Sequence, residues 1–128
     1  MRTAHQAFVE SWLSRRARGA DVRGLAKEAL GAVWSRSRRG MASLCLQALG
    51  RAARDGAARE LPLLSDVSVG PDGFSLDGIE QASPDELRAA LCGLLVELLS
   101  VVECATGDIL APALQAELLR IGRAGADG

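Results

Sequence analysis

Aromatic residues are scarce in this chain of 128 residues, which contains two phenylalanines, two tryptophans and no tyrosine. Because β-strands favour aromatic and β-branched side chains, this shortage argues against a β-sandwich. The chain is nevertheless 48% hydrophobic and 24% charged, close to the globular average, which excludes wholesale disorder. A core of Leu, Val and Ala is typical of close-packed helices. We therefore expect a single domain over residues 1–128, with a disordered tail at 123–128.

The residues that catalyse reactions or bind metals are also few. The single histidine, His5, lies close to the N-terminus, where we expect the chain to fray, so it is poorly placed for phosphotransfer or for a catalytic triad. No group of histidines and cysteines has the spacing of a zinc site. The glycines form neither a GxxxxGK[ST] nor a GxGxxG phosphate-binding loop. The sequence thus predicts that the protein is not an enzyme and holds no metal or cofactor.

Three cysteines, Cys45, Cys92 and Cys104, lie within apolar helical patterns without any CxxC pair. We interpret them as small buried hydrophobic residues. Their odd number and the lack of a signal peptide indicate a reducing, cytoplasmic location. The most apolar window, 89–102, is short and contains Glu97, so we expect no membrane span.

Apolar side chains at helical spacing predict helices in the first half of the chain. Residues 3–18 carry such a stripe and are followed by Gly19, a natural helix stop. The next apolar face begins at Val22 and stays in phase across Gly40. Two interpretations are open: one long helix from 22 to 54, or two helices that meet near Gly40. We favour the long helix.

The second half of the chain contains a hairpin signal followed by a capped helix. Between residues 66 and 77, apolar and polar residues alternate on both sides of the sequence GPDG at 70–73, which predicts a β-hairpin. A lone hairpin is marginal in water, so it must pack on the helices or pair with strands of another copy. Ser83 and Glu86 have the spacing of a capping box, which predicts a helix from 84 to about 105.

The stretch 87–119 is apolar on more than one side, so a helix formed from it cannot lie half in water. It must be the centre of a packed helical domain or the face on which two copies meet. We assign a role in the core and in a homodimer interface to five side chains: Leu91, Leu94, Leu95, Leu98 and Val102. A last helix is expected to face the core through four residues: Leu110, Leu114, Leu118 and Ile121.

The formal net charge is only −1, but the charges are unevenly distributed. Residues 1–64 carry twelve basic and five acidic side chains, whereas residues 65–128 carry three basic and eleven acidic ones. The two halves should attract each other within one chain or between two copies. All but one of the basic residues are arginine, a bias typical of GC-rich bacterial genomes. Six of them form a candidate basic patch, which is either a solvated surface or a site for an anionic partner: Arg15, Arg16, Arg18, Arg36, Arg38 and Arg39.

These features together predict a mainly α fold, a bundle of four to five helices with one β-hairpin inserted at about residues 66–77. The leading functional hypothesis is a non-catalytic protein–protein interaction or regulatory module, a homodimer in bacterial signalling. One alternative is a nucleic-acid-binding regulator that uses the arginine clusters. The other is a small-ligand sensor with an apolar pocket between helices.

Overall fold

The computed structural model describes residues 2–16, 22–79, 81–106 and 109–121. In these ranges the chain forms five α-helices, two short 3₁₀-helices and a two-stranded antiparallel sheet, in the following order: α1 (Arg2–Arg16), α2 (Val22–Arg38), α3 (Ser43–Ala58), η1 (Pro62–Asp66), β1 (Ser68–Gly70), β2 (Gly73–Ser75), η2 (Asp77–Ile79), α4 (Pro84–Thr106) and α5 (Leu110–Arg120). The predicted helical bundle with an inserted hairpin is confirmed. The expected tail at 123–128 lies outside the described residues.

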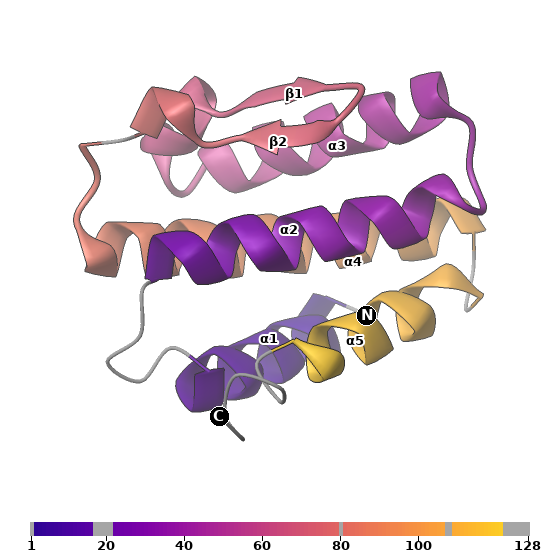
Figure 1. The fold of residues 1–128 in the computed structure, drawn as a ribbon, viewed down its shortest axis with the longest axis horizontal. Helices are drawn as coiled ribbons and strands as arrows, with labels where there is room; N and C mark the ends of the chain where they lie inside the picture. Colours follow the sequence, from indigo (N-terminus) through magenta and orange to yellow (C-terminus); the bar gives the residue numbers. More distant parts are fainter. Residues whose placement is uncertain (1, 17–21, 80, 107–108, 122–128) are drawn as a thin grey trace.

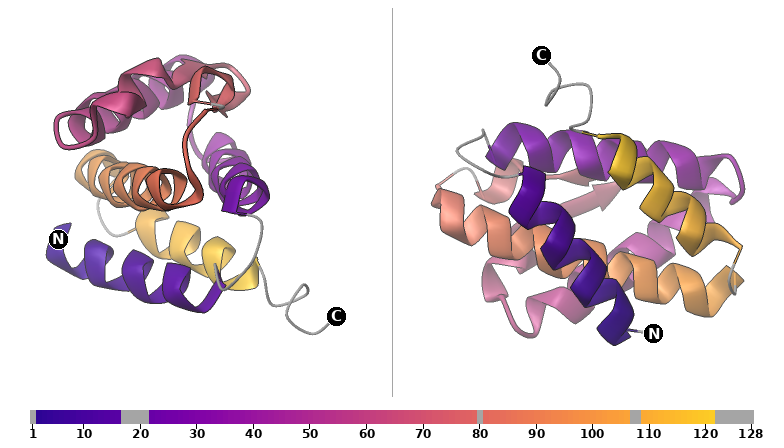
Figure 2. Two further views of the ribbon diagram at one scale, coloured as in Figure 1. Left: turned by 90° about the vertical axis from the view of Figure 1, so that its left-hand side faces the viewer. Right: turned by 90° about the horizontal axis from the view of Figure 1, so that it is seen from below.

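The helices form three layers (Figure 1). The helix α3 and the hairpin make one outer layer, α2 and α4 the middle layer, and α1 and α5 the other outer layer. A view turned by 90° shows the same three layers (Figure 2). Helix α4 contacts each of the other four helices. A hydrophobic core therefore forms around it, with buried side chains from every described helix and from the segment around the hairpin.

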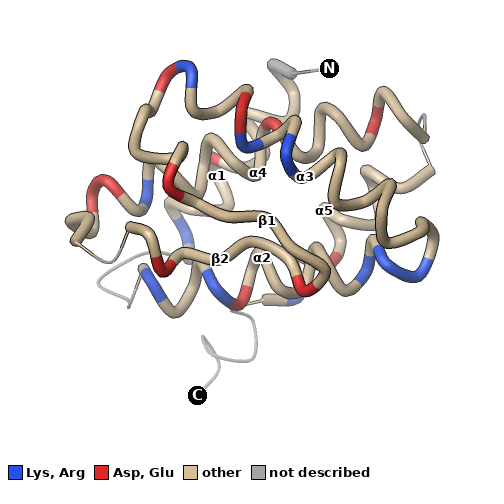
Figure 3. The backbone as a smooth tube through the Cα atoms, turned by 90° about the horizontal axis from the view of Figure 1, so that it is seen from above, with Lys and Arg blue, Asp and Glu red and all other residues tan. Residues whose placement is uncertain are grey.

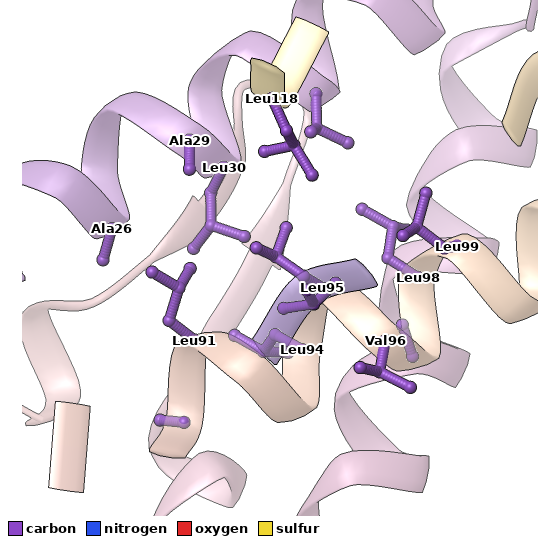
Figure 4. Close-up of a cluster of buried hydrophobic side chains, with 14 of the residues drawn as sticks. Ala26, Ala29, Leu30, Leu91, Leu94, Leu95, Val96, Leu98, Leu99 and Leu118 are labelled. Atoms are coloured by element: carbon purple, nitrogen blue, oxygen red, sulfur yellow. The ribbon is translucent and has the colours of Figure 1, made fainter. Parts of the chain in front are cut away.

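The apolar circumference of α4 follows from its place in the middle layer. At 100° per residue, its buried side chains span roughly 240° of the helix. Figure 4 shows Leu91 and Leu95 of α4 packed with Leu30 of α2 and Leu118 of α5. The buried set of α4 comprises Leu87, Ala90, Leu91, Leu94, Leu95, Val96, Leu98, Leu99 and Val102. A helix with neighbours on so many sides needs only a narrow polar strip.

A capping box fixes the start of α4. The backbone N–H of Glu86 donates to the Ser83 Oγ at 3.2 Å, and the backbone N–H of Ser83 donates to the Glu86 Oε1 at 2.9 Å. Two amide groups near the helix start thereby gain side-chain partners. The predicted capping box is confirmed, and the helix runs one residue beyond its predicted end, to Thr106.

The hairpin packs on the helices of its own chain, one of the two arrangements that the sequence left open. The register pairs Ser68 with Ser75, Val69 with Phe74, and Gly70 with Gly73. Trp34 of α2 anchors it, because its Nε1 donates to the Pro71 carbonyl at 3.2 Å and its ring meets Phe74 edge-on, with 5.5 Å between centroids. Gly73 has a φ of +118°, and its missing Cβ leaves room for the Trp34 indole.

The prediction of one long helix over residues 22–54 is wrong. Helix α2 ends at Arg38 and α3 begins at Ser43, so two helices meet near Gly40. The end of α2 tightens into a 3₁₀-type turn, in which the N–H of Gly40 donates to the carbonyl of Ser37 at 3.1 Å. The residue before α3, Ala42, is extended. The apolar periodicity did not reveal the break because α2 and α3 both pack on α4. Two apolar helix faces in phase give the same sequence pattern as one continuous helix.

Two helical glycines should respond in opposite ways to the same substitution. A Cβ at Gly31 in α2 would meet nothing within 4 Å, whereas one at Gly50 in α3 would lie 2.9 Å from Trp34 Cζ3 and 3.0 Å from Val69 Cγ1. Gly31→Ala should raise the free energy of unfolding by about 0.5–1 kcal/mol, because alanine restricts the unfolded chain. Gly50→Ala should lower it by about 1–3 kcal/mol through overpacking. Urea unfolding measures the free energy of unfolding of both variants. Changes of the same sign would contradict the packing of the hairpin on α3.

The burial of α4 makes a second prediction about stability. Leu95 is fully buried, whereas Leu44 in the first turn of α3 is 81% exposed. Leu95→Ala should lower the free energy of unfolding by about 2–5 kcal/mol, because it leaves a cavity in the core. Leu44→Ala, the matched control, should change it by less than about 0.5 kcal/mol. A Leu95→Ala protein as stable as the parent in urea would show that α4 is not at the centre of the fold.

Candidate functional site

The arginines of the predicted basic patch do not form one surface. Arg15 is exposed in the last turn of α1, Arg16 ends that helix, and Arg18 lies outside the described residues. Figure 1 shows α1 ending on the side of the molecule where α2 begins. Helix α2 has 17 residues and is therefore about 25 Å long. The other three arginines lie at and just beyond its far end: Arg36, Arg38 and Arg39.

The cluster at the end of α2 gains a further arginine from α5. A polar pocket of about 190 Å³ lies between these two helices, and we call it the arginine pocket. Its lining residues are Ala32, Ser35, Arg36, Arg39, Glu117 and Arg120. The Arg120 Nη1 donates to the Glu117 Oε1 at 3.1 Å. Three guanidinium groups thus border one space that holds a single carboxylate. Sequence reasoning missed Arg120, because only the tertiary contact of α2 with α5 brings it there.

Folding mixes the basic and acidic halves of the chain. The helices of the basic half, α1 to α3, pack on α4 of the acidic half. Figure 3 shows acidic and basic positions interspersed over the side that carries the hairpin. Arg54 pairs with its neighbour Asp55, with 3.0 Å between Nη2 and Oδ1, within the same half of the chain. On this side the charge asymmetry of the sequence therefore does not become a face of one sign.

A second and larger pocket, of about 400 Å³, lies between α1 and α4, and we call it the α1–α4 pocket. Its lining residues are Glu10, Leu13 and Ser14 of α1 and Asp85, Arg88, Ala89 and Cys92 of α4. In each helix they follow the first lining residue by three, four or seven positions, which places them on one helix face. The lining combines charged and apolar side chains, so this pocket differs from the apolar one that the sequence suggested for a ligand sensor.

His5 is buried, contrary to the expectation of a frayed terminus. Its Nδ1 lies 3.3 Å from the Nε2 of Gln115 on α5, and its Nε2 lies 3.3 Å from the Oε1 of Glu103 on α4. The second distance is that of an ion pair, but this ring nitrogen has no partner in hydrogen-bond geometry. His5 thus joins three helices, and its two neighbours are an amide and a carboxylate. In the described part of the chain, no three His, Cys, Asp or Glu residues are grouped to hold a metal ion.

The side chains assigned to a homodimer interface lie inside this chain. Each of them is at most 2% exposed: Leu91, Leu94, Leu95, Leu98 and Val102. Their place in the core is shown, but in this fold none of them offers a surface to a second copy. Helix α4 is long and apolar enough to cross a membrane by length and composition. Within this fold, 44% of the apolar window of α4 is buried against other parts of the chain.

The expectation that all three cysteines are buried is wrong for two of them. Cys45 and Cys104 are exposed, and only Cys92 is half-buried, in the wall of the α1–α4 pocket. Burial raises the pKa of the Cys92 thiol, the nearby Glu10 carboxylate raises it further, and the Arg88 guanidinium partly offsets both. Cys92 is therefore a weak nucleophile. The apolar sequence pattern gave a wrong prediction for these two cysteines because small residues also lie on the solvent side of these helices.

The described residues form a helical bundle, and the arginine pocket and the α1–α4 pocket are candidate binding sites between its helices. The chain matches no protein-family model, and no curated protein and no solved structure is significantly similar to it. Its function must therefore be argued from the geometry and chemistry of these pockets.

The cysteines provide a direct test of the α1–α4 pocket wall. Iodoacetamide should alkylate the exposed Cys45 and Cys104 well before Cys92, because burial and a raised pKa both lower the supply of reactive thiolate at Cys92. Peptide mass spectrometry after timed labelling measures the three rates. In urea the three rates should converge, which serves as the control. Labelling of Cys92 in the folded protein as fast as that of Cys45 would contradict its position in the wall.

Proposed function

We propose that this chain is a non-catalytic interaction module that binds an acidic segment of another protein in the arginine pocket. The main support is the convergence of Arg36, Arg39 and Arg120, from two helices, on one space. Guanidinium groups stay protonated at physiological pH, so they bind anions and do not act as general bases. The chemistry of the pocket is therefore recognition of negative charge.

A carboxylate is the anion that fits this pocket best. Arg120 is already paired with the carboxylate of Glu117, so an arginine of this pocket accepts a carboxylate partner. Arg36 and Arg39 have no acidic partner among the residues that the structure describes. Their planar forks can each take a carboxylate in a bidentate arrangement. The volume, about 190 Å³, is below that of typical small-molecule sites but accommodates a single acidic side chain.

The same residues support a nucleic-acid partner less well. Duplex DNA is held by many cations that follow its phosphates. Here the length of α2 separates the two arginine clusters, so they do not form one continuous row of cations along a duplex. The homodimer and the role in bacterial signalling remain predictions from the sequence, and the buried leucines of α4 no longer support the homodimer.

A fluorescent oligoglutamate peptide tests the proposal by anisotropy. Arg36→Gln combined with Arg39→Gln should weaken its binding by about tenfold or more, equivalent to about 1.4 kcal/mol, because two charge-assisted contacts are lost. The matched control is Arg51→Gln combined with Arg59→Gln, which removes the same charge from exposed positions in α3 and just after its end, in the opposite outer layer. This control should change the affinity by less than about twofold.

The controls separate specific recognition from general attraction. An oligoglutamine peptide of the same length should not bind. Equal losses in the two double variants would mean that net charge alone drives binding, which would contradict a site in the arginine pocket. Tighter binding of duplex DNA than of the peptide, with a steep salt dependence, would replace the proposal with the nucleic-acid alternative.

A further inference from the structure

No residue lines both the α1–α4 pocket and the arginine pocket. The volume of the α1–α4 pocket, about 400 Å³, falls in the range of small-molecule sites. The lining residues lie on one face of each helix, at positions 10, 13 and 14 of α1 and 85, 88, 89 and 92 of α4. Because both faces belong to helices packed in the core, the pocket is held by rigid elements rather than by loops.

Charges of both signs border this pocket and do not neutralise one another. Glu10 and Asp85 contribute carboxylates, and Arg88 contributes a guanidinium. Among the described residues, none of these three forms an ion pair. The Glu10 carboxylate accepts a hydrogen bond from Gln6, at 2.9 Å between Nε2 and Oε2. The pocket thus offers separate anchors for a cation and for an anion.

The rest of the lining is uncharged and, apart from the Ser14 hydroxyl, apolar. Leu13 is buried beneath the pocket, with 2% of its surface exposed, and Ala89 and the half-buried Cys92 lie on the α4 side. The raised pKa of Cys92 keeps its thiol neutral at physiological pH, so it adds no third negative charge. An aliphatic group placed here would be partly shielded from water by contact with these side chains.

We propose that the α1–α4 pocket binds a free amino acid with an aliphatic side chain. Its carboxylate pairs with Arg88, its ammonium group pairs with Glu10 and Asp85, and its side chain lies on Leu13 and Cys92. The Ser14 hydroxyl is available to either polar group of the ligand. This inference rests on residues that the proposed interaction site does not use, so either can fail without the other.

Ligands of other charge fit the pocket less well. A nucleotide or another polyanion would be repelled by two carboxylates. A simple carboxylic acid would satisfy Arg88 but would bring negative charge toward Glu10 and Asp85. A simple amine would satisfy the carboxylates and leave Arg88 without a partner. Only a zwitterion uses both kinds of anchor.

Three probes of the same shape test this inference on the unmodified protein. They are L-leucine, 3-methylbutylamine, which lacks the carboxylate, and 4-methylpentanoate, which lacks the ammonium group. In a titration followed by two-dimensional ¹H–¹⁵N NMR, leucine should shift amides of α1 and α4 around the pocket in a saturable way. Each of the other two probes should bind about tenfold more weakly or worse, because one anchor is lost.

Two variants assign the contacts. Arg88→Gln should weaken the binding of leucine by about tenfold and should not weaken that of 3-methylbutylamine, because the amine makes no use of Arg88, whereas Glu10→Gln should weaken both. Arg38→Gln, an exposed arginine outside the pocket, is the control and should alter neither. The inference is overturned if leucine gives no saturable shifts near the pocket, or if the amine alone binds as tightly as leucine.

Discussion

Helix α4 has to hide apolar side chains over roughly two thirds of its circumference, and the rest of the fold is arranged around this requirement. A helix of this kind needs neighbours on several sides, and the chain supplies them as four other helices in three layers. Burial of this surface is the main source of stability, because apolar burial drives folding. The capping box at Ser83 and the hydrogen bond from Trp12 Nε1 to the Leu118 carbonyl, at 2.6 Å, then fix where the elements meet.

Because the apolar face of α4 is enclosed, the two pockets rather than that face are the candidate surfaces for contact with other molecules. The arginine pocket and the α1–α4 pocket both lie where the outer faces of two helices approach each other. They differ in charge, since one is rich in guanidinium groups and the other carries anchors of both signs. This difference is the physical basis for proposing two distinct ligands, an acidic protein segment and a free amino acid.

Much of the fold could be predicted from local sequence signals. The features that depend on tertiary contacts could not be predicted in this way. The capping box and the turn at 70–73 were recognisable because backbone and side chain interact within a few residues. The break near Gly40 was missed because the apolar period continues across it. Arg36 and Arg39 were recognised as a cluster, but Arg120 joins them only through the packing of α5 on α2. The exposed Cys45 shows that a small apolar residue in a helix need not face the core.

The dependence of the urea unfolding midpoint on protein concentration tests most directly whether α4 is enclosed within one chain. If the buried face of α4 is satisfied by the other helices of the same molecule, the midpoint is independent of concentration. If a second copy covers that face, dimer formation adds to stability and the midpoint rises with concentration. The structure predicts a constant midpoint, and a midpoint that rises with concentration would contradict it.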